Sequence, residues 1–188
     1  MSSRIVIERI ATEEALQATA TAADLAVVEQ FGSASRRCEA LAWRAIVRRE
    51  LGEEVTIGYD ANGAPIVNVP NIYISVSHSR DMVAVLFSER TCAVDIESAS
   101  RDFCRVVDRY LSQEERQIAD EYGLYAEMWS AKEAMYKFYR KGGLDLINDI
   151  SIKAFNADRG VLCGSILGGE EIEVSVKCED GLVVAMID

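Results

Sequence analysis

The sequence has 188 residues, of which 49% are apolar, and a formal net charge of -11 at pH 7. This length can bury one sizeable core or two small ones, and the composition is that of a soluble globular protein. The acidic balance argues against a nucleic-acid-binding protein, no run approaches the roughly 18 apolar residues of a membrane span, and five scattered cysteines form no C-x-x-C pair. We therefore expect a cytoplasmic protein with reduced thiols.

The first half of the chain predicts one strand, two helices and then short strands. Apolar residues first alternate with charged ones, then recur at helical spacing with few breakers, and later alternate again around clusters of turn residues. In chain order these elements are a strand at 4–10, helices at 13–31 and 33–51, a turn at 60–63, and strands at 72–76 and 82–87 with the hairpin connection 77–81.

The second half restarts the same pattern after Cys92. Its elements are a strand at 95–97, helices at 112–122 and 125–140, and short strands that include 172–177 and 182–187 around a tight turn at 178–181. Strand, two helices and hairpins are thus given twice, although the two sequences do not visibly match. The pattern predicts an α+β fold of two similar halves, 1–90 and 91–188, related by a pseudo-twofold axis with a cleft between them.

Several arginines fall in the helix predicted at 33–51. Arg37, Arg44 and Arg48 are spaced so that they share one side of the helix, where they could meet phosphate groups. An ordinary solvated helix face explains the same spacing, and spacing alone favours that interpretation.

Asp95 and Glu97 form a pair of acids on one strand. Because side chains alternate in a strand, the two carboxylates point the same way, and we expect Val94 and Ile96 to point into the core. Two adjacent carboxylates suit a magnesium ion, which takes carboxylate oxygens together with substrate phosphates and water. A strand end with two exposed acids is the simpler alternative for this pair alone.

The helix predicted at 127–139 adds a third acid. Its polar side is expected to carry Lys132, Glu133 and Lys137, opposite a buried side of Met128, Ala131, Met135 and Phe138. Glu133 and Lys137 alone could be an ordinary surface ion pair one turn apart. Beside the strand acids, Glu133 becomes a third ligand for one divalent ion, with the two lysines placed to neutralise diphosphate oxygens.

His78 is the only histidine of the sequence and lies between two serines. A lone histidine is more often a surface residue than a catalyst, and no second histidine is present to act as the base of a serine hydrolase. Hydrogen bonds from the imidazole and Ser77 to a phosphate group are the economical functional interpretation.

Three segments together resemble the motifs of the 4′-phosphopantetheinyl transferases. Ser75-Val76-Ser77-His78-Ser79, Ala93-Val94-Asp95-Ile96-Glu97 and Trp129-Ser130-Ala131-Lys132-Glu133-Ala134, followed by Lys137, appear in the family's order. The first of them is similar to a motif of the longer, two-half type that activates surfactin synthetase and other peptide and polyketide synthases. The resemblance implies Mg²⁺-dependent transfer of 4′-phosphopantetheine from coenzyme A to a serine of an apo acyl or peptidyl carrier protein, with release of 3′,5′-ADP.

The same resemblance implies a role for each matching residue. Asp95, Glu97 and Glu133 would be metal ligands, and Glu133 would also act as the base. Lys137 would contact a phosphate, and Lys132 would be a catalytic helper. Ser77 and His78 would hold a phosphate of coenzyme A, and Arg44 resembles a phosphate-contacting arginine. Glu115 could touch the metal's water shell or form a helix capping box with Ser112. Because one chain carries both halves, a monomer is expected.

Two positions depart from the family pattern. Ala64 stands where a lysine or arginine that contacts coenzyme A is common, and Ala93 where glycine is usual. Two other functions therefore stay open: a magnesium-dependent phosphohydrolase that uses the same acids, and a non-catalytic module that binds coenzyme A or a carrier protein. The sequence also leaves open which carrier is modified, in fatty-acid, polyketide or peptide synthesis, and whether the metal is magnesium or manganese.

Overall fold

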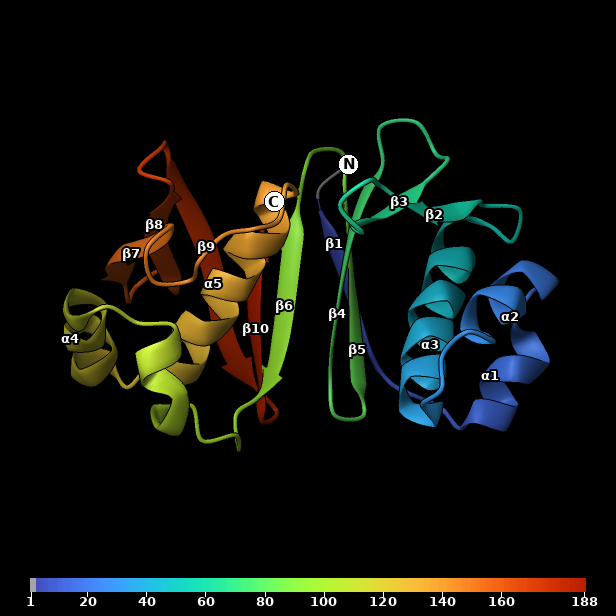
Figure 1. Cartoon of the computed structure of the whole chain (residues 1–188), viewed down its shortest axis with the longest axis horizontal. Helices are drawn as coiled ribbons and strands as arrows, with labels where there is room; N and C mark the ends of the chain where they lie inside the picture. The colour runs from blue at the N-terminus through green and yellow to red at the C-terminus, as the bar shows by residue number, and fades with distance from the viewer. Residues whose placement is uncertain (1–2) are drawn as a thin grey trace. The chain divides into compact units, whose positions relative to one another are not determined.

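The computed structural model describes residues 3–188 of a mixed α+β protein. The chain divides into two compact units, residues up to Arg90 and Thr91–Asp188, which we call unit 1 and unit 2 and describe separately. Each combines helices with an antiparallel sheet (Figure 1). Among residues 3–188, no helix has both the length and the apolar character needed to cross a membrane.

In unit 1, the last of three helices packs against a three-stranded sheet, and the first two helices pack on that helix. Its elements are β1 (Arg4–Arg9), α1 (Glu13–Thr19), α2 (Ala22–Val28), α3 (Ala34–Leu51), β2 (Ile57–Tyr59), β3 (Pro65–Val67), β4 (Tyr73–Ser79) and β5 (Met82–Ser88). The main sheet has the order β1-β5-β4, and β2 and β3 form a separate hairpin. Trp43, Ile46 and Val47 of α3 belong to one buried cluster with Val83 and Val85 of β5, so α3 is the helix that covers the sheet's core face.

Two predictions for unit 1 are wrong in detail. The segment predicted as one helix at 13–31 is two, because Ala20 is extended and the Thr21 side chain accepts a hydrogen bond from the amide of Asp24, which starts α2. Ser77, His78 and Ser79 belong to β4 rather than to a loop. The hairpin connection is only Arg80-Asp81, with Arg80 in the left-handed region at φ 55°.

Unit 2 lays one long helix across a five-stranded sheet. Its elements are β6 (Ala93–Ser98), the 3-10 helix η1 (Cys104–Arg109), α4 (Gln113–Tyr122), α5 (Tyr125–Tyr139), β7 (Ile150–Asn156), β8 (Val161–Ile166), β9 (Glu171–Glu179) and β10 (Leu182–Ile187). The strand order is β6-β10-β9-β8-β7, and α5 contacts all five strands. The predicted turn is a two-residue hairpin in which Asp180 and Gly181 both have positive φ.

The helix-covered face of β6 carries the acids. Asp95 and Glu97 both bond to side chains of α5, and Ala93 on the same face belongs to the buried cluster beneath that helix. Val94 and Ile96 are also buried, but they point to the opposite face of the sheet. The prediction that these two residues point into the core is confirmed by their burial, but the face of β6 that meets α5 is the one that carries the acids.

Gly164 lies at a close approach of β8 to β7. A Cβ atom at this position would overlap the carbonyl oxygen of Ser151 and lie 3.2 Å from the Cε of Met135 in α5. β7 has a bulge next to this site, since the register shifts between Ile152 and Ala154. Glycine is therefore needed for the close strand contact beneath α5.

We predict that Gly164→Ala lowers the free energy of unfolding by about 1–3 kcal/mol, because neither the Ser151 carbonyl nor the packed helix can yield without strain. Urea unfolding followed by circular dichroism measures the loss. Gly32→Ala is the matched control, because a Cβ there meets no atom within 4 Å. Equal losses for both variants would contradict the packing argument.

Candidate functional site

A cluster of three acids and one lysine lies between β6 and α5 of unit 2. Lys137 donates hydrogen bonds to Oδ1 of Asp95 at 2.9 Å and to the carbonyl of Val94 at 3.0 Å. Asp95 is buried, so this ammonium group supplies the charge that a buried carboxylate needs. The helix–strand pair Lys137–Asp95 thus forms where the sequence suggested a pair between Lys137 and Glu133.

Glu97 is held by two donors. Its Oε1 accepts from the Arg101 guanidinium at 2.8 Å and from the indole N–H of Trp129 at 3.1 Å. The Arg101 guanidinium also lies 4.8 Å from the ring centre of Phe103 and 5.3 Å from that of Trp129. Arg101 is a residue that the sequence analysis missed, and its only signal was the spacing of four residues from Glu97.

Glu133 completes the cluster from α5. Burial raises the pKa of its carboxyl group, and the neighbouring Asp95 and Glu97 raise it further against the opposing effect of Lys137 and Arg101. A carboxylate with a raised pKa is a better proton acceptor than an ordinary one. The effect of Asp95 and Glu97 on this pKa shows that the three carboxyl groups lie in one electrostatic environment.

The three acids are suitable ligands for a magnesium ion, but their side chains are not arranged around one site. Carboxylate oxygens are the hard ligands that Mg²⁺ prefers. Within residues 3–188, however, no three His, Cys, Asp or Glu side chains are grouped closely enough to hold a metal ion. Asp95 and Glu97 instead bond to Lys137 and Arg101, so metal binding would require these side chains to rearrange.

Lys132 does not lie on the polar side of α5, where the sequence analysis put it. It is 0% exposed, and its ammonium group donates to Oε2 of Glu115 at 2.7 Å, to the carbonyl of Leu146 at 2.7 Å and to that of Ile150 at 2.8 Å. These three acceptors use all three ammonium protons. The predicted position of Lys132 is therefore wrong, because the charge that suggested exposure is satisfied inside the unit.

Glu115 is the partner of that buried lysine. Of its two predicted roles, the capping box with Ser112 is confirmed at the start of α4. Glu115 is only 2% exposed, and its carboxylate also accepts from the backbone amide of Ile152 at 2.7 Å. These bonds commit the carboxylate to the interior of unit 2.

His78 lines a pocket of about 330 Å³ in unit 1, between β4 and the start of α3. The imidazole is half exposed, and its Nε2 lies 3.5 Å from a carboxylate oxygen of Glu39. Arg36 adds a cationic side chain to the pocket wall, and Trp43 and Tyr59 add aromatic surface. Cations beside aromatic rings can bind an aromatic ring system that carries phosphate.

Ser77 does not share this pocket. Neighbouring residues of a strand point to opposite faces, and β4 turns Val76 and His78 toward the pocket while Ser77 is buried on the other face. The predicted joint grip of Ser77 and His78 on one phosphate assumed a loop, and the strand separates the two side chains.

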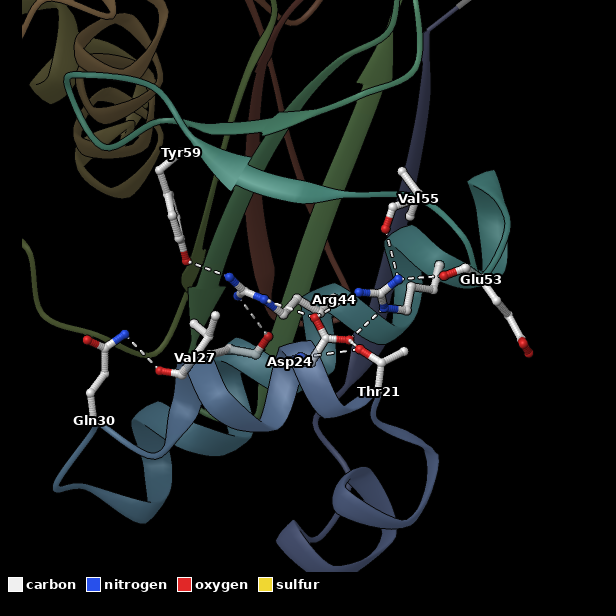
Figure 2. Close-up of polar contacts among 10 residues, drawn as sticks. Thr21, Asp24, Val27, Gln30, Arg44, Glu53, Val55 and Tyr59 are labelled. Atoms are coloured by element: carbon white, nitrogen blue, oxygen red, sulfur yellow. Dashed lines mark hydrogen bonds and ion pairs between the residues drawn. The ribbon is translucent and has the colours of Figure 1, made fainter.

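Arg44 lies in the interior of unit 1 and is 2% exposed. Its guanidinium lies 3.4 Å from the Asp24 carboxylate and donates to the Tyr59 hydroxyl at 3.2 Å (Figure 2). It also lies 4.2 Å from the ring centre of Trp43. The side chain ties α3 to α2 and to the β2-β3 hairpin. The structure thus corrects the predicted exposed position from which Arg44 would contact a phosphate.

The other two arginines that were predicted to share one side of this helix also form ion pairs. Arg37 bonds to Glu13 of α1, and Arg48 donates to Asp24 at 2.6 Å and to the carbonyls of Glu53 and Val55. The simpler prediction of an ordinary solvated helix face is also wrong for Arg37 and Arg48, because their ion pairs join α3 to neighbouring elements.

One comparison with known proteins identifies a family. Residues 91–186, just over half of the chain, match the family model described as ACPS: 4′-phosphopantetheinyl transferase superfamily. This span contains Asp95, Glu97, Glu133 and Lys137. No curated protein matches the chain.

We predict that Asp24→Asn lowers the free energy of unfolding by about 3–5 kcal/mol at pH 7, because Arg44 and Arg48 stay buried without their counter-charge. Burial raises the pKa of the Asp24 carboxyl, but hydrogen bonds from Arg48 and Thr21 outweigh it and lower the pKa below 3.8. The carboxylate therefore stabilises the fold above pH 3.8, and this contribution is lost as the pH falls through the folded pKa.

Chemical denaturation of wild type and variant between pH 7 and pH 2.5 measures this difference. We expect the gap between the two proteins to narrow on acidification. Glu173→Gln, which removes an exposed ion pair with Arg159, is the control and is expected to change the midpoint little. A gap that does not depend on pH would contradict the assignment to an ionised Asp24.

Proposed function

The chain belongs to the 4′-phosphopantetheinyl transferase superfamily, and from this premise we propose that it transfers 4′-phosphopantetheine from coenzyme A to a serine of an apo acyl or peptidyl carrier protein. The observation that carries the proposal is the cluster of Asp95, Glu97, Glu133 and Lys137 inside the matched span. Three acids that would share a divalent ion after their side chains rearrange, next to a lysine, suit the transfer of a highly charged phosphate group.

Each residue of the cluster has a task in this proposal. Asp95, Glu97 and Glu133 would hold Mg²⁺, which when bound neutralises charge on the diphosphate of coenzyme A. Glu133, with its raised pKa, accepts the proton of the carrier serine directly or through water. The serine oxygen then bonds to the β-phosphorus, the bond from that phosphorus to the bridging oxygen breaks, and 3′,5′-ADP leaves with the electron pair.

Lys137 is the residue that we propose to contact the phosphates. Its ammonium group bonds to Asp95 and to the backbone carbonyl of Val94, so its position is fixed on β6. Asp95 would be one of the residues that hold the metal ion, and the Lys137 ammonium group, released from that carboxylate, would then bond to a phosphate oxygen. Such a charge-assisted bond stabilises the charge that develops on the leaving diphosphate oxygen.

The pocket of unit 1 supports binding of the adenosine part of coenzyme A. His78 and Arg36 provide positive or hydrogen-bonding groups for a phosphate, and Trp43 and Tyr59 provide faces for an adenine ring. Arg36 also offers a charge in compensation for Ala64, the position at which family members often carry a basic residue. Arg44 and Ser77 have no part in this proposal, because both are buried and neither lines the pocket.

We further propose that the protein belongs to the longer, two-half type that includes activators of surfactin synthetase, and that it acts in the cytoplasm as a monomer. Both compact units occur in one chain, whereas half-size relatives must assemble to form their sites. Holo-[acyl-carrier-protein] synthase activity is the expected assignment, with carriers of fatty-acid, polyketide or peptide synthesis as candidate partners.

We predict that Glu133→Gln reduces transfer at least about 100-fold, because it removes both a metal ligand and the proton acceptor. Intact-mass measurement of an apo carrier after incubation with coenzyme A and Mg²⁺ detects the added group. Glu127→Gln, in the first turn of the same helix, is the matched control and should stay active. Hydrolysis of coenzyme A in the absence of a carrier would instead favour the phosphohydrolase. Binding of coenzyme A without any chemical change would favour the non-catalytic binding module.

We predict that His78→Gln weakens coenzyme A binding about 10- to 100-fold, the usual worth of a hydrogen bond to a charged group. Calorimetry measures the dissociation constant without catalysis. The control ligand is 3′-dephospho-coenzyme A, which both proteins should bind equally if His78 contacts the 3′-phosphate. Equal loss for the two ligands would move His78 away from that phosphate.

A further inference from the structure

We infer that the buried pair Glu115–Lys132 is a positioning device that fixes the rotation of α5 and thereby directs Glu133 and Lys137 toward β6. This inference rests on the proposed function only in that Glu133 and Lys137 are taken as catalytic groups that must face β6. It assigns Lys132 a positioning role in place of the catalytic helper role that the family resemblance implied. The evidence comes from the bonds of the pair, from the edge of the sheet and from the geometry of the helix.

The pair occupies the open edge of the sheet. β7 is the end strand, and its residues Ile150 and Ile152 turn their backbone groups to the same side, away from β8. The carbonyl of Ile150 accepts from Lys132 at 2.8 Å, and the amide of Ile152 donates to Glu115 at 2.7 Å. The two side chains together therefore replace the backbone groups of a further strand.

Full burial makes these bonds directional constraints. Lys132 is 0% and Glu115 2% exposed, so no water can take over a bond that is lost. Lys132 also donates to the Leu146 carbonyl at 2.7 Å, and Glu115 accepts from the Ser112 amide at 2.7 Å. A rotation of α5 would break several bonds at once, which is the condition for a unique orientation.

The helix is held at both end strands of the sheet. Lys132 fastens α5 to β7, and Lys137 fastens it to β6 through Asp95 and the Val94 carbonyl. At about 100° per residue, Glu133 is turned about 100° from Lys132 and lies about 40° from Lys137 on the helix surface. Fixing Lys132 on β7 therefore leaves Glu133 and Lys137 pointing to the β6 side.

Kinetics of two single variants test the positioning role. Lys132→Met removes the ammonium group, and Glu115→Gln places an amide donor against three donors. We expect both to lower kcat about 100-fold at saturating coenzyme A and carrier, because small misplacements of catalytic groups have effects of this size, while KM for coenzyme A stays within about twofold. The double variant Lys132→Met/Glu115→Leu, with an apolar pair in place of the ions, is expected to fold and to show the same loss.

The neighbouring acid supplies a control. Glu114 is exposed and bonds only locally, to the Ser112 hydroxyl, so Glu114→Gln should keep wild-type kcat and KM. All rates are compared below the unfolding transition of each variant. A tenfold rise in KM for coenzyme A in Lys132→Met, without loss in Glu115→Gln, would make Lys132 a phosphate ligand and overturn the inference. Unchanged kcat in both variants with lowered Tm would reduce the pair to a stabilising element, and also overturn it.

A readout without catalysis separates this inference from the proposed function. Met128 and Met135 are buried on α5, so their methyl NMR shifts report how the helix packs on the sheet. In Glu115→Gln we expect both shifts to move and the Ile152 amide to exchange faster. Unchanged shifts would overturn the inference even if the wild type transfers phosphopantetheine. If the wild type did not transfer phosphopantetheine, the proposed function would be overturned. The methyl NMR shifts would still test whether the Glu115–Lys132 pair positions α5.

Discussion

Charged groups removed from water need both a counter-charge and hydrogen-bond partners, and the helices of both units are held in place by groups of this kind. In unit 1, Asp24 receives Arg44 and Arg48 and so joins α2 to α3. In unit 2, Glu115 receives Lys132 and so joins α4 and α5 to the edge of the sheet. Apolar contacts can slide, whereas these bonds allow one arrangement, and the site on β6 and α5 inherits its geometry from them.

The secondary structure was largely readable from the sequence, because periodicity reports which side of an element is buried. The predictions failed where local hydrogen bonding or tertiary context outweighed the pattern. The Thr21 hydroxyl accepts from the amide of Asp24 and so begins α2 just after α1 has ended with its C-cap Ala20, a signal that a long periodic run conceals. Ser77, His78 and Ser79 suggested a loop because they are polar, yet these residues pair with β5 as a strand, and the two serines lie on its buried face.

The candidate site was predictable in its membership but less in its contacts. The spacing of Asp95 and Glu97 on a strand required a shared face, and helical spacing gave Glu133 and Lys137 a common side. Which face of β6 meets α5, and therefore that Lys137 pairs with Asp95, depends on how the helix packs on the sheet. The charges of Lys132 and Arg44 predicted surface positions for both side chains. Their burial was not predictable, because a sequence does not reveal which buried acid will form an ion pair with a given cation.

Both units share one strand order, in which the first strand pairs with the last and the last with the one before it. β6, which carries Asp95 and Glu97, therefore pairs with β10, whose residues 182–187 come about 90 positions later. On a ribosome, the acids of the site emerge long before the strand that will flank them. Unit 2 must then hold β6 unpaired until β10 inserts between β6 and β9, so the assembly of the site coincides with the final long-range step of folding.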